Sequence, residues 1–480
     1  MRNYFFTLVL FLTIHNVFAQ FEKGYASCAW QDTIPPSIYN DLERRLESFK
    51  SSVEASSAKE RSFVHSLYQK RFDFVVGQFN DDYFITDCDM TTYLQGVLNT
   101  IYDANPSLPR EATVYVHRSF VPNAVSFGDG TIGFTLGLLS RMDNEALIAF
   151  VLCHELAHYH TGHSTKSIHD LTRLNFDKEL QKKIKDIRSS EYNRYSRYKD
   201  LVKGLGLEIN RHSREHEFEA DSLGLVYYAN TNYNLLGATR TIEVLDSVDI
   251  NKYTANVDFK RFFNFKEYAF KDSWLEYTKS NMWYSTMDET GEDTTKTHPS
   301  CQRRLVALNR QLTRGSKKVP GTLLSDARAL SISTKSDFEL VESAYHFKAY
   351  GQCLFTALLL ADHYPNNAYL HAMIGRSLYQ LYAHQKNHEL GKVLQLPDPR
   401  FDENYDRFLT FIHTLRLNEL ASLSYYYMIN GQKEFFENED YLYSLWLCSD
   451  LDMSKLDRNK VKEDYQERFP KGRFLNDMTK

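Results

Sequence analysis

The feature that most constrains this chain is an apolar stretch, residues 145–153. It is followed directly by two histidines and a glutamate: His154, Glu155 and His158. After Glu145 the stretch is apolar on every side of a helix, which predicts a helix buried through the core. His154 and His158 are four residues apart, so both imidazoles point from one helix face toward the same place. Glu155 stands beside the first histidine. Burying these polar groups is costly unless they are paired or bind a metal ion.

The spacing is that of the H-E-x-x-H pattern of zinc peptidases, in which the histidines bind zinc and the glutamate is the general base. Zinc in such sites has three protein ligands and a water molecule, so a third ligand must come from elsewhere in the chain. His163 is one candidate, because metzincins carry a third histidine shortly after this pattern. Here Gly162 and His163 each miss the metzincin spacing by one residue. This predicts that His160 and His163 lie at the surface or behind the ligands.

Glu217 is the other candidate for the third ligand. It lies in a predicted helix over residues 214–228, four residues before Asp221 and on the same helix face. Ala220 and Gly224 are small residues that let this helix pack closely against a neighbour. A carboxylate ligand, together with an aspartate that accepts the free N–H of a ligand histidine, is a usual arrangement around zinc.

A second carboxylate pair, Glu215 and Glu219, has the same four-residue spacing. From spacing alone this pair fits a solvated helix face equally well. It has no accompanying stripe of small residues, so we predict that Glu217 is the third ligand.

Together these motifs resemble the HtpX and CAAX-prenyl-protease family of zinc metallopeptidases, gluzincins with H-E-x-x-H on one helix and E-x-x-A-D on another. The resemblance covers residues 113–308 and includes Asn123-Ala124, Gly137-Leu138-Leu139, Asp143-Asn144-Glu145 and Thr297-His298-Pro299 followed by Arg304. It implies one zinc ion bound by His154, His158 and Glu217. It also implies a catalytic set of Glu155 as base, Asp221 behind a ligand histidine, and His298 and Arg304 near the cleft.

The chain departs from the membrane-bound members of this family, which carry transmembrane helices. After the first twenty residues, no stretch is long and apolar enough to span a bilayer. The chain is closer to the soluble, secreted BepA-like branch, in which tetratricopeptide repeats follow the peptidase domain. Two roles for His298 stay open. It donates a hydrogen bond to the tetrahedral oxyanion, or it occupies a fourth position on zinc and keeps the enzyme latent.

The first residues predict a secretory signal peptide. A positive start, an apolar run over residues 4–14 and a small-residue cleavage site at Ala19 define residues 1–19 as the segment to be removed. The mature protein is then expected outside the cytoplasm, in the periplasm or secreted, where disulfides are permitted. Cys28 and Cys88 are the pair we expect to be bridged, although the sequence alone does not settle the pairing. Cys153 is expected to be a packed thiol or a neighbour of the metal.

Around the central helix the sequence predicts an α+β fold. Helices are expected over residues 38–67, with Ser37 as the cap, and over residues 90–103. Alternation over residues 112–117 predicts a strand, and residues 125–135 around a Gly-Asp-Gly turn predict a hairpin. Either is expected to pair with an extended substrate backbone. A solvated helical pair is expected within residues 164–213. The result is a mainly helical zincin domain with a small sheet, residues 20–315.

Two later segments differ in composition from this domain. Residues 245–297 are rich in aromatic side chains and are expected to form the core of an inserted subdomain rather than the cover of a cleft. A cluster of Arg, Gly, Ser, Lys and Pro at residues 312–321 marks a domain boundary. Residues 322–480 are predicted to be an all-α module. Within it, residues 341–383 have the spacing of a tetratricopeptide-type helical hairpin, with another helical bundle as the alternative.

These features favour a zinc-dependent endopeptidase that acts on misfolded or unassembled proteins outside the cytoplasm. Its substrates would be proteins or peptides, and the C-terminal helical module would recruit substrates or a protein partner. The formal net charge of −5, with both signs well mixed, predicts no nucleic-acid surface. The alternative is a catalytically latent metal-binding chaperone or scaffold that acts through the helical module.

Overall fold

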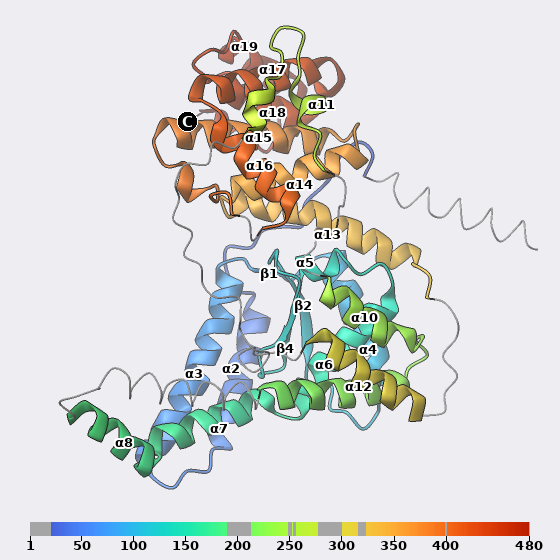
Figure 1. Ribbon diagram of the computed structural model, residues 1–480, viewed down its shortest axis with the longest axis vertical. Coiled ribbons are helices and arrows are strands. Elements are labelled where there is room, and N and C mark those ends of the chain that lie inside the picture. The colour runs from blue at the N-terminus through green and yellow to red at the C-terminus, as the bar shows by residue number, and fades with distance from the viewer. Residues whose placement is uncertain are drawn as a thin grey trace, which may run out of the picture. The chain divides into compact units, whose positions relative to one another are not determined.

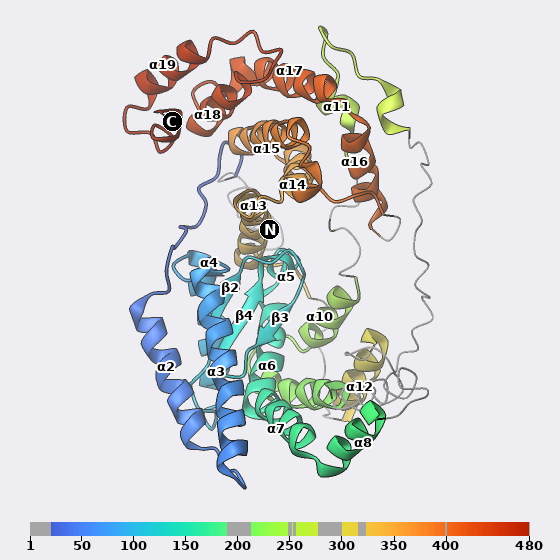
Figure 2. The same ribbon diagram turned by 90° about the vertical axis from the view of Figure 1, so that its left-hand side faces the viewer.

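The computed structural model describes residues 21–189, 213–247, 252, 256–276, 300–314, 323–398 and 401–479. The chain forms two compact units, each assembled from segments that are discontinuous in sequence. An α+β unit takes residues 28–248 and 285–332, and a helical unit takes residues 1–27, 249–284 and 333–480. Figures 1 and 2 show the elements of both units by label.

The α+β unit surrounds one small sheet with helices, as the sequence predicts. Its strands are β1 (Phe84–Ile85), β2 (Thr113–His117), β3 (Ala124–Ser126) and β4 (Thr131–Thr135). Its labelled helices are α2 (Pro36–Ser51), α3 (Ala58–Asn80), α4 (Asp89–Ala104), α5 (Leu136–Leu139), α6 (Glu145–His160), α7 (His163–Phe176), α8 (Lys178–Ser189), α10 (Leu236–Asp246) and α12 (Cys301–Arg314). A further helix covers residues 213–229.

The four strands lie in the order β1-β2-β4-β3. β2 and β4 are parallel, while the β1–β2 and β3–β4 pairs are antiparallel. Val114 and Val116 of β2 are fully buried on the face that α4 covers. Tyr115 points to the opposite face and packs on the aromatic core between the sheet and α3. The sheet therefore lies between α2 and α3 on one side and α4 and α6 on the other (Figure 1).

The predicted hairpin is confirmed by the antiparallel pairing of β3 with β4. Gly128 and Gly130 in its turn have φ angles of 79° and 95°, which other residues rarely adopt. Of the two elements expected to pair with a substrate backbone, β2 already pairs with β4 along its length and with β1 at residues 116–117. β3 is the edge strand beside α6.

The long helix expected over residues 38–67 is two helices. α2 ends at Ser51 and α3 begins at Ala58. Ser57 caps α3, because its side chain accepts a hydrogen bond from the backbone N–H of Glu60. The first helix starts at Pro36 without a side-chain cap, so Ser37 does not have the predicted role. Two serine pairs, Ser51-Ser52 and Ser56-Ser57, thus flank the break between the two helices.

The expected disulfide between Cys28 and Cys88 is confirmed. The other four cysteines, Cys153, Cys301, Cys353 and Cys448, are free thiols. Cys153 is fully buried in α6, and burial raises its pKa well above the ordinary value. A thiol with a raised pKa is a poor nucleophile, so Cys153 is a packing residue.

The helical unit is built around one central helix. Its elements are α11 (Phe259–Phe263), the 3₁₀ turn η1 (Asp272–Leu275), α13 (Ala327–His346), which begins in the last segment of the α+β unit, α14 (Tyr350–His363), α15 (Ala368–Lys386), η3 (Leu390–Lys392), α16 (Glu403–Thr414), α17 (Leu417–Phe435), α18 (Glu439–Cys448), α19 (Arg458–Arg468) and η4 (Asp477–Thr479). α15 contacts α14, α17 and α18. The hairpin of α14 and α15 lies where the sequence predicts a helical hairpin. Gly375 lets α17 approach, since a β-carbon there would lie 2.2 Å from the sulfur of Met428.

The described part of the aromatic-rich segment, residues 256–276, packs on the helical unit. Phe259 stacks on Phe411 of α16 with ring centroids 4.6 Å apart, and Tyr268 stacks on Tyr426 of α17 at 5.6 Å. Trp274 lies edge-on to Phe411 at 6.4 Å. This segment was expected to be an insertion of the peptidase domain. The structure differs, because its rings are buried by helices more than a hundred residues later.

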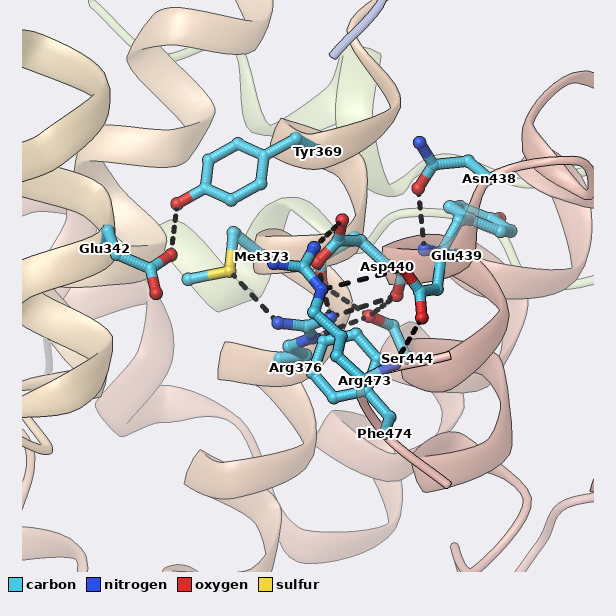
Figure 3. A network of polar contacts seen from close by, with 12 residues as sticks. Glu342, Tyr369, Met373, Arg376, Asn438, Glu439, Asp440, Ser444, Arg473 and Phe474 are labelled. Atoms are coloured by element: carbon cyan, nitrogen blue, oxygen red, sulfur yellow. Dashed lines mark hydrogen bonds and ion pairs between the residues drawn. The ribbon is translucent and has the colours of Figure 1, made fainter. Parts of the chain in front are cut away.

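A buried ion pair joins α15 to α18 inside the helical unit. Arg376, only 5% exposed, donates a 2.8 Å hydrogen bond to the carboxylate of Asp440. Arg473 donates to the other oxygen of that carboxylate, and Figure 3 shows both guanidinium groups converging on it. The Arg376 guanidinium also lies 4.6 Å from the ring centroid of Phe474. The last residues of the described chain are thereby fixed against the central helix.

Among the described residues, no helix combines the length and the apolar composition needed to cross a bilayer.

Replacing Asp440 with asparagine should destabilise the helical unit by about 3 kcal/mol, since Arg376 would remain charged and buried without its counter-charge. Amide hydrogen exchange in α15 and α18, followed by mass spectrometry, should then be about 100-fold faster. Arg468→Ala is the control: it removes an ion pair with Glu437, whose side chain is 80% exposed, and should cost less than about 1 kcal/mol. Equal exchange rates in the two variants would contradict a stabilising role for the buried pair.

Candidate metal centre

The centre begins with α6, the buried helix that carries the two histidines. Asn144 caps it, because its side chain accepts a hydrogen bond from the N–H of Ala146. Every residue from Ala146 to Ala157 is buried, which confirms the buried helix predicted from the apolar residues 146–153. The Nε2 atoms of His154 and His158 lie 3.0 Å apart. The two imidazoles therefore face one point, as expected from their spacing.

Glu217 in the 213–229 helix completes the cluster. Its carboxylate oxygens lie 3.7 Å from Nε2 of His154 and 3.4 Å from Nε2 of His158. The glutamate is 7% exposed. The helices can come this close because of Gly224: a β-carbon there would lie 3.1 Å from the backbone N and Cα of His154. The small residue predicted to permit close packing thus lies at the helix contact that brings Glu217 to the histidines.

The geometry of these side chains fits a zinc ion. Ligand atoms of His154, His158 and Glu217 all lie within 4.8 Å of one another. Two ligands of a tetrahedral zinc ion at about 2.0–2.2 Å are about 3.3 Å apart. The three observed separations, 3.0, 3.4 and 3.7 Å, lie around that value. Two imidazoles and one carboxylate are also a donor set that zinc peptidases use.

Behind His154 lies a buried carboxylate–guanidinium pair. The Oδ1 atom of Asp221 is 3.0 Å from Nδ1 of His154. Arg304 of α12 holds both oxygens of Asp221 through hydrogen bonds of 2.8 and 2.7 Å. Burial alone would raise the pKa of Asp221, but the bonds from Arg304 and the contact with His154 outweigh it and lower that pKa. Asp221 therefore stays ionised beside the Nδ1 edge of His154, while Nε2 of that ring faces the centre.

Arg304 was predicted to lie near the cleft as part of the catalytic set. The structure places it behind Asp221, and its Nη1 atom is 3.8 Å from a carboxylate oxygen of the ligand Glu217. Its side chain is 8% exposed. Arg304 and Asp221 are therefore positioning residues, which act through the ligands rather than on a substrate.

Behind His158 lies His163, which is not in the ligand cluster. The two Nδ1 atoms are 2.7 Å apart, on the side of the His158 ring opposite to Glu217. Nε2 of His163 is 3.0 Å from the carboxylate of Glu219. Burial lowers the pKa of His163 to about 4, so the ring is neutral. A neutral His163 can accept the Nδ1 proton of His158 and donate its own Nε2 proton to Glu219.

His163 therefore lies behind a ligand, which is one of the two places predicted for it, and it is not at the surface, being 5% exposed. The contact with Glu219 was not predicted. Glu219 and Glu215 looked alike in the sequence, but Glu219 is used by His163 and Lys166. The chain reverses at Gly162, with a φ of 65°, and this turn sets α7 against the 213–229 helix. In the sequence, only the glycine shortly after the H-E-x-x-H motif indicated this turn.

Glu155, the predicted base, is 7% exposed and follows His154 in α6. Burial lowers the pKa of His158, but its contact with Glu217 and the nearby charge of Glu155 raise that pKa above the ordinary value overall. Glu155 is thus close to the ligand ring. His160 is half-buried against Tyr227, 5.8 Å between ring centroids, and lies outside the cluster. His298 lies outside the described residues, so its predicted role rests on the sequence.

Comparison with known proteins agrees with this geometry. The model of peptidase family M48 matches residues 90–312, a little under half of the chain. The matched region contains the three ligand residues, Glu155, Asp221, Arg304 and the undescribed His298. It overlaps the region whose motifs resemble the HtpX and CAAX-prenyl-protease family. No curated protein matches the chain in sequence. Residues 90–312 are thus similar to peptidase family M48, which indicates a metallopeptidase.

Proposed function

We propose that this protein is a zinc-dependent endopeptidase that hydrolyses peptide bonds in misfolded or unassembled proteins outside the cytoplasm. The observation that carries the proposal is the convergence of His154, His158 and Glu217 beside the buried Glu155. The similarity to a peptidase family over the same residues supports it.

Each side chain of the centre has a distinct part in this proposal. Zinc on the three ligands would polarise a water molecule and the scissile carbonyl. Glu155 would act as the general base for that water and would return the proton to the leaving amine. Asp221 holds the ring of His154, and His163 holds the ring of His158, so that both Nε2 atoms point at one place. His298, which lies outside the described residues, would either donate to the oxyanion or act as a further zinc ligand in a latent state.

β3 is the element best placed to align a substrate. It is an edge strand, it contacts α6, and only its β4 side is paired within the sheet. An extended substrate that adds to this edge is held by backbone hydrogen bonds, which fix the register without requiring a sequence. Such recognition suits unfolded polypeptides, whose backbones are free to pair. A folded protein would have to expose an extended segment first.

The proposed location outside the cytoplasm rests on the signal-peptide pattern of residues 1–19. The Cys28–Cys88 disulfide is consistent with it, because such bonds persist in oxidising compartments. We also propose that the chain belongs to a branch of the family in which tetratricopeptide repeats follow the peptidase domain. The α14–α15 hairpin is compatible with one such repeat.

Glu155→Gln should lower the rate of casein cleavage by about 100- to 10,000-fold, because the amide cannot accept the water proton. Zinc content measured by atomic emission should stay at about one ion per chain, since Glu155 is not a ligand. Glu43→Gln on α2, an exposed glutamate, is the control and should cleave normally. Equal cleavage by wild type and Glu155→Gln would refute the catalytic assignment. A wild type that retains zinc but cleaves nothing would favour the latent chaperone.

The third ligand is tested by comparing zinc affinities in competition with a chromogenic chelator. Glu217→Ala should weaken zinc binding by more than about 100-fold, because a direct ligand is lost. His163→Ala should weaken it by only about 10- to 100-fold, because His163 orients His158 without touching the ion. Glu215→Ala is the matched control on the exposed face of the same helix. The reverse order of the first two variants would establish the metzincin-like arrangement instead.

A further inference from the structure

The N-terminal segment, residues 21–27, lies against helices of the helical unit and forms no helix or strand of its own. Two of its backbone carbonyls are held. The side chain of Asn367, which is fully buried, donates to the carbonyl oxygen of Phe21. The backbone N–H of Ala368 donates to the carbonyl oxygen of Lys23 over 3.2 Å. Both donors lie at the turn that leads into α15.

Two aromatic side chains of the segment, four positions apart, point into the unit. Phe21 is 4% exposed and stacks on Phe338 of α13, with ring centroids 5.1 Å apart. Tyr25 lies 5.0 Å from the same ring and edge-on to Tyr369 of α15 at 5.3 Å. Between them, Glu22 and Lys23 are exposed. The segment therefore presents its aromatic side chains to the unit and its charged ones to solvent.

The tyrosine hydroxyl has a specific acceptor. Tyr25 donates to the carboxylate of Glu339, a residue of α13 that is fully buried. A phenylalanine at this position would leave that contact unmade, at the cost of a buried polar group losing a partner. The second position thus favours tyrosine, whereas the first accepts an apolar aromatic ring.

Proteins recognise extended peptides through hydrogen bonds to the peptide backbone, together with contacts to some of its side chains. Residues 21–27 are bound in this way. We propose that the surface formed by Phe338, Glu339, Asn367 and Tyr369, hereafter the Phe338 surface, recognises extended segments of other polypeptides. Its ligand has an aromatic residue followed four positions later by tyrosine. Residues 21–27 are its intramolecular occupant. This inference does not depend on the metal centre.

Because the occupant is tethered, it acts at an effective concentration in the millimolar range. A free peptide of the same sequence therefore competes poorly with it. Only a ligand that binds more tightly, or that carries several such aromatic pairs, displaces the segment. Unfolded polypeptides offer aromatic pairs with many intervening sequences, and the surface tolerates variation at the first two intervening positions because Glu22 and Lys23 are exposed.

The test measures the fluorescence anisotropy of a labelled peptide with the sequence of residues 21–27. The full chain is used with Glu155→Gln, so that hydrolysis does not disturb the signal. Adding Phe21→Ala and Tyr25→Ala to the protein should empty the surface and tighten peptide binding at least tenfold. Glu22→Ala with Lys23→Ala is the control and should bind as weakly as the unaltered chain.

Changes in the peptide leave the protein's folding untouched. Replacing its tyrosine with phenylalanine should weaken binding to the Phe21→Ala/Tyr25→Ala protein severalfold, and replacing both rings with alanine should abolish it. Phe338→Ala in that protein should also abolish binding. Three results would overturn the proposal: equal binding by the occupied and emptied proteins, no binding by either, or undiminished binding of the alanine peptide.

Discussion

The structure of the α+β unit depends on one unfavourable arrangement, a group of charges at the end of an apolar helix. Glu155, Glu217 and Asp221 are all less than 10% exposed, and the buried Arg304 is the positive charge that contacts this group. Arg304 contacts two of these carboxylates, Glu217 and Asp221, and the Nε2 atoms of His154 and His158 face Glu217. Buried charge without a partner is very costly, so a divalent cation at the Nε2 atoms of the histidines satisfies the electrostatics as well as the geometry. The close helix packing at Gly224 brings Glu217 to the histidines, and it thereby also brings the buried carboxylates close to one another.

Local sequence patterns predicted the elements that carry this group. The missing polar face of residues 146–153 indicated a helix buried on all sides, and the alternation of residues 112–117 indicated a strand. Four-residue spacing placed His154 above His158 and Glu217 before Asp221. These predictions held because each depends on contacts within one element. The identity of the third ligand required a judgement about helix packing, and the small residue Gly224 supplied it.

What the sequence did not predict depends on contacts between distant segments. The partner of His163 could not be found because Glu219 lies on a different side of its helix from Glu217, and only the turn at Gly162 brings α7 to it. The pairing of β2 on its second side depends on β1, a strand of two residues that has no pattern of its own. The aromatic residues of segment 256–276 were recognised as core, but the sequence does not say whose core they join.

The helical domain therefore includes more of the chain than the residues after the predicted boundary. A boundary near residue 322 would separate α14 to α19 from residues 21–27 and 256–276, although both segments bury aromatic rings against them. Removing the segments would expose Phe338 and Phe411, two fully buried side chains, and each large aromatic ring that loses its cover costs about 2 kcal/mol. The two losses are not equivalent, however. Segment 256–276 stacks several rings on α16 and α17 as a fixed part of the core, whereas residues 21–27 are held by two rings, a hydroxyl and two carbonyls. A ligand that can be replaced makes few contacts, and each of them can be broken separately. We therefore propose that another peptide can replace residues 21–27 at the Phe338 surface, but not segment 256–276 at Phe411.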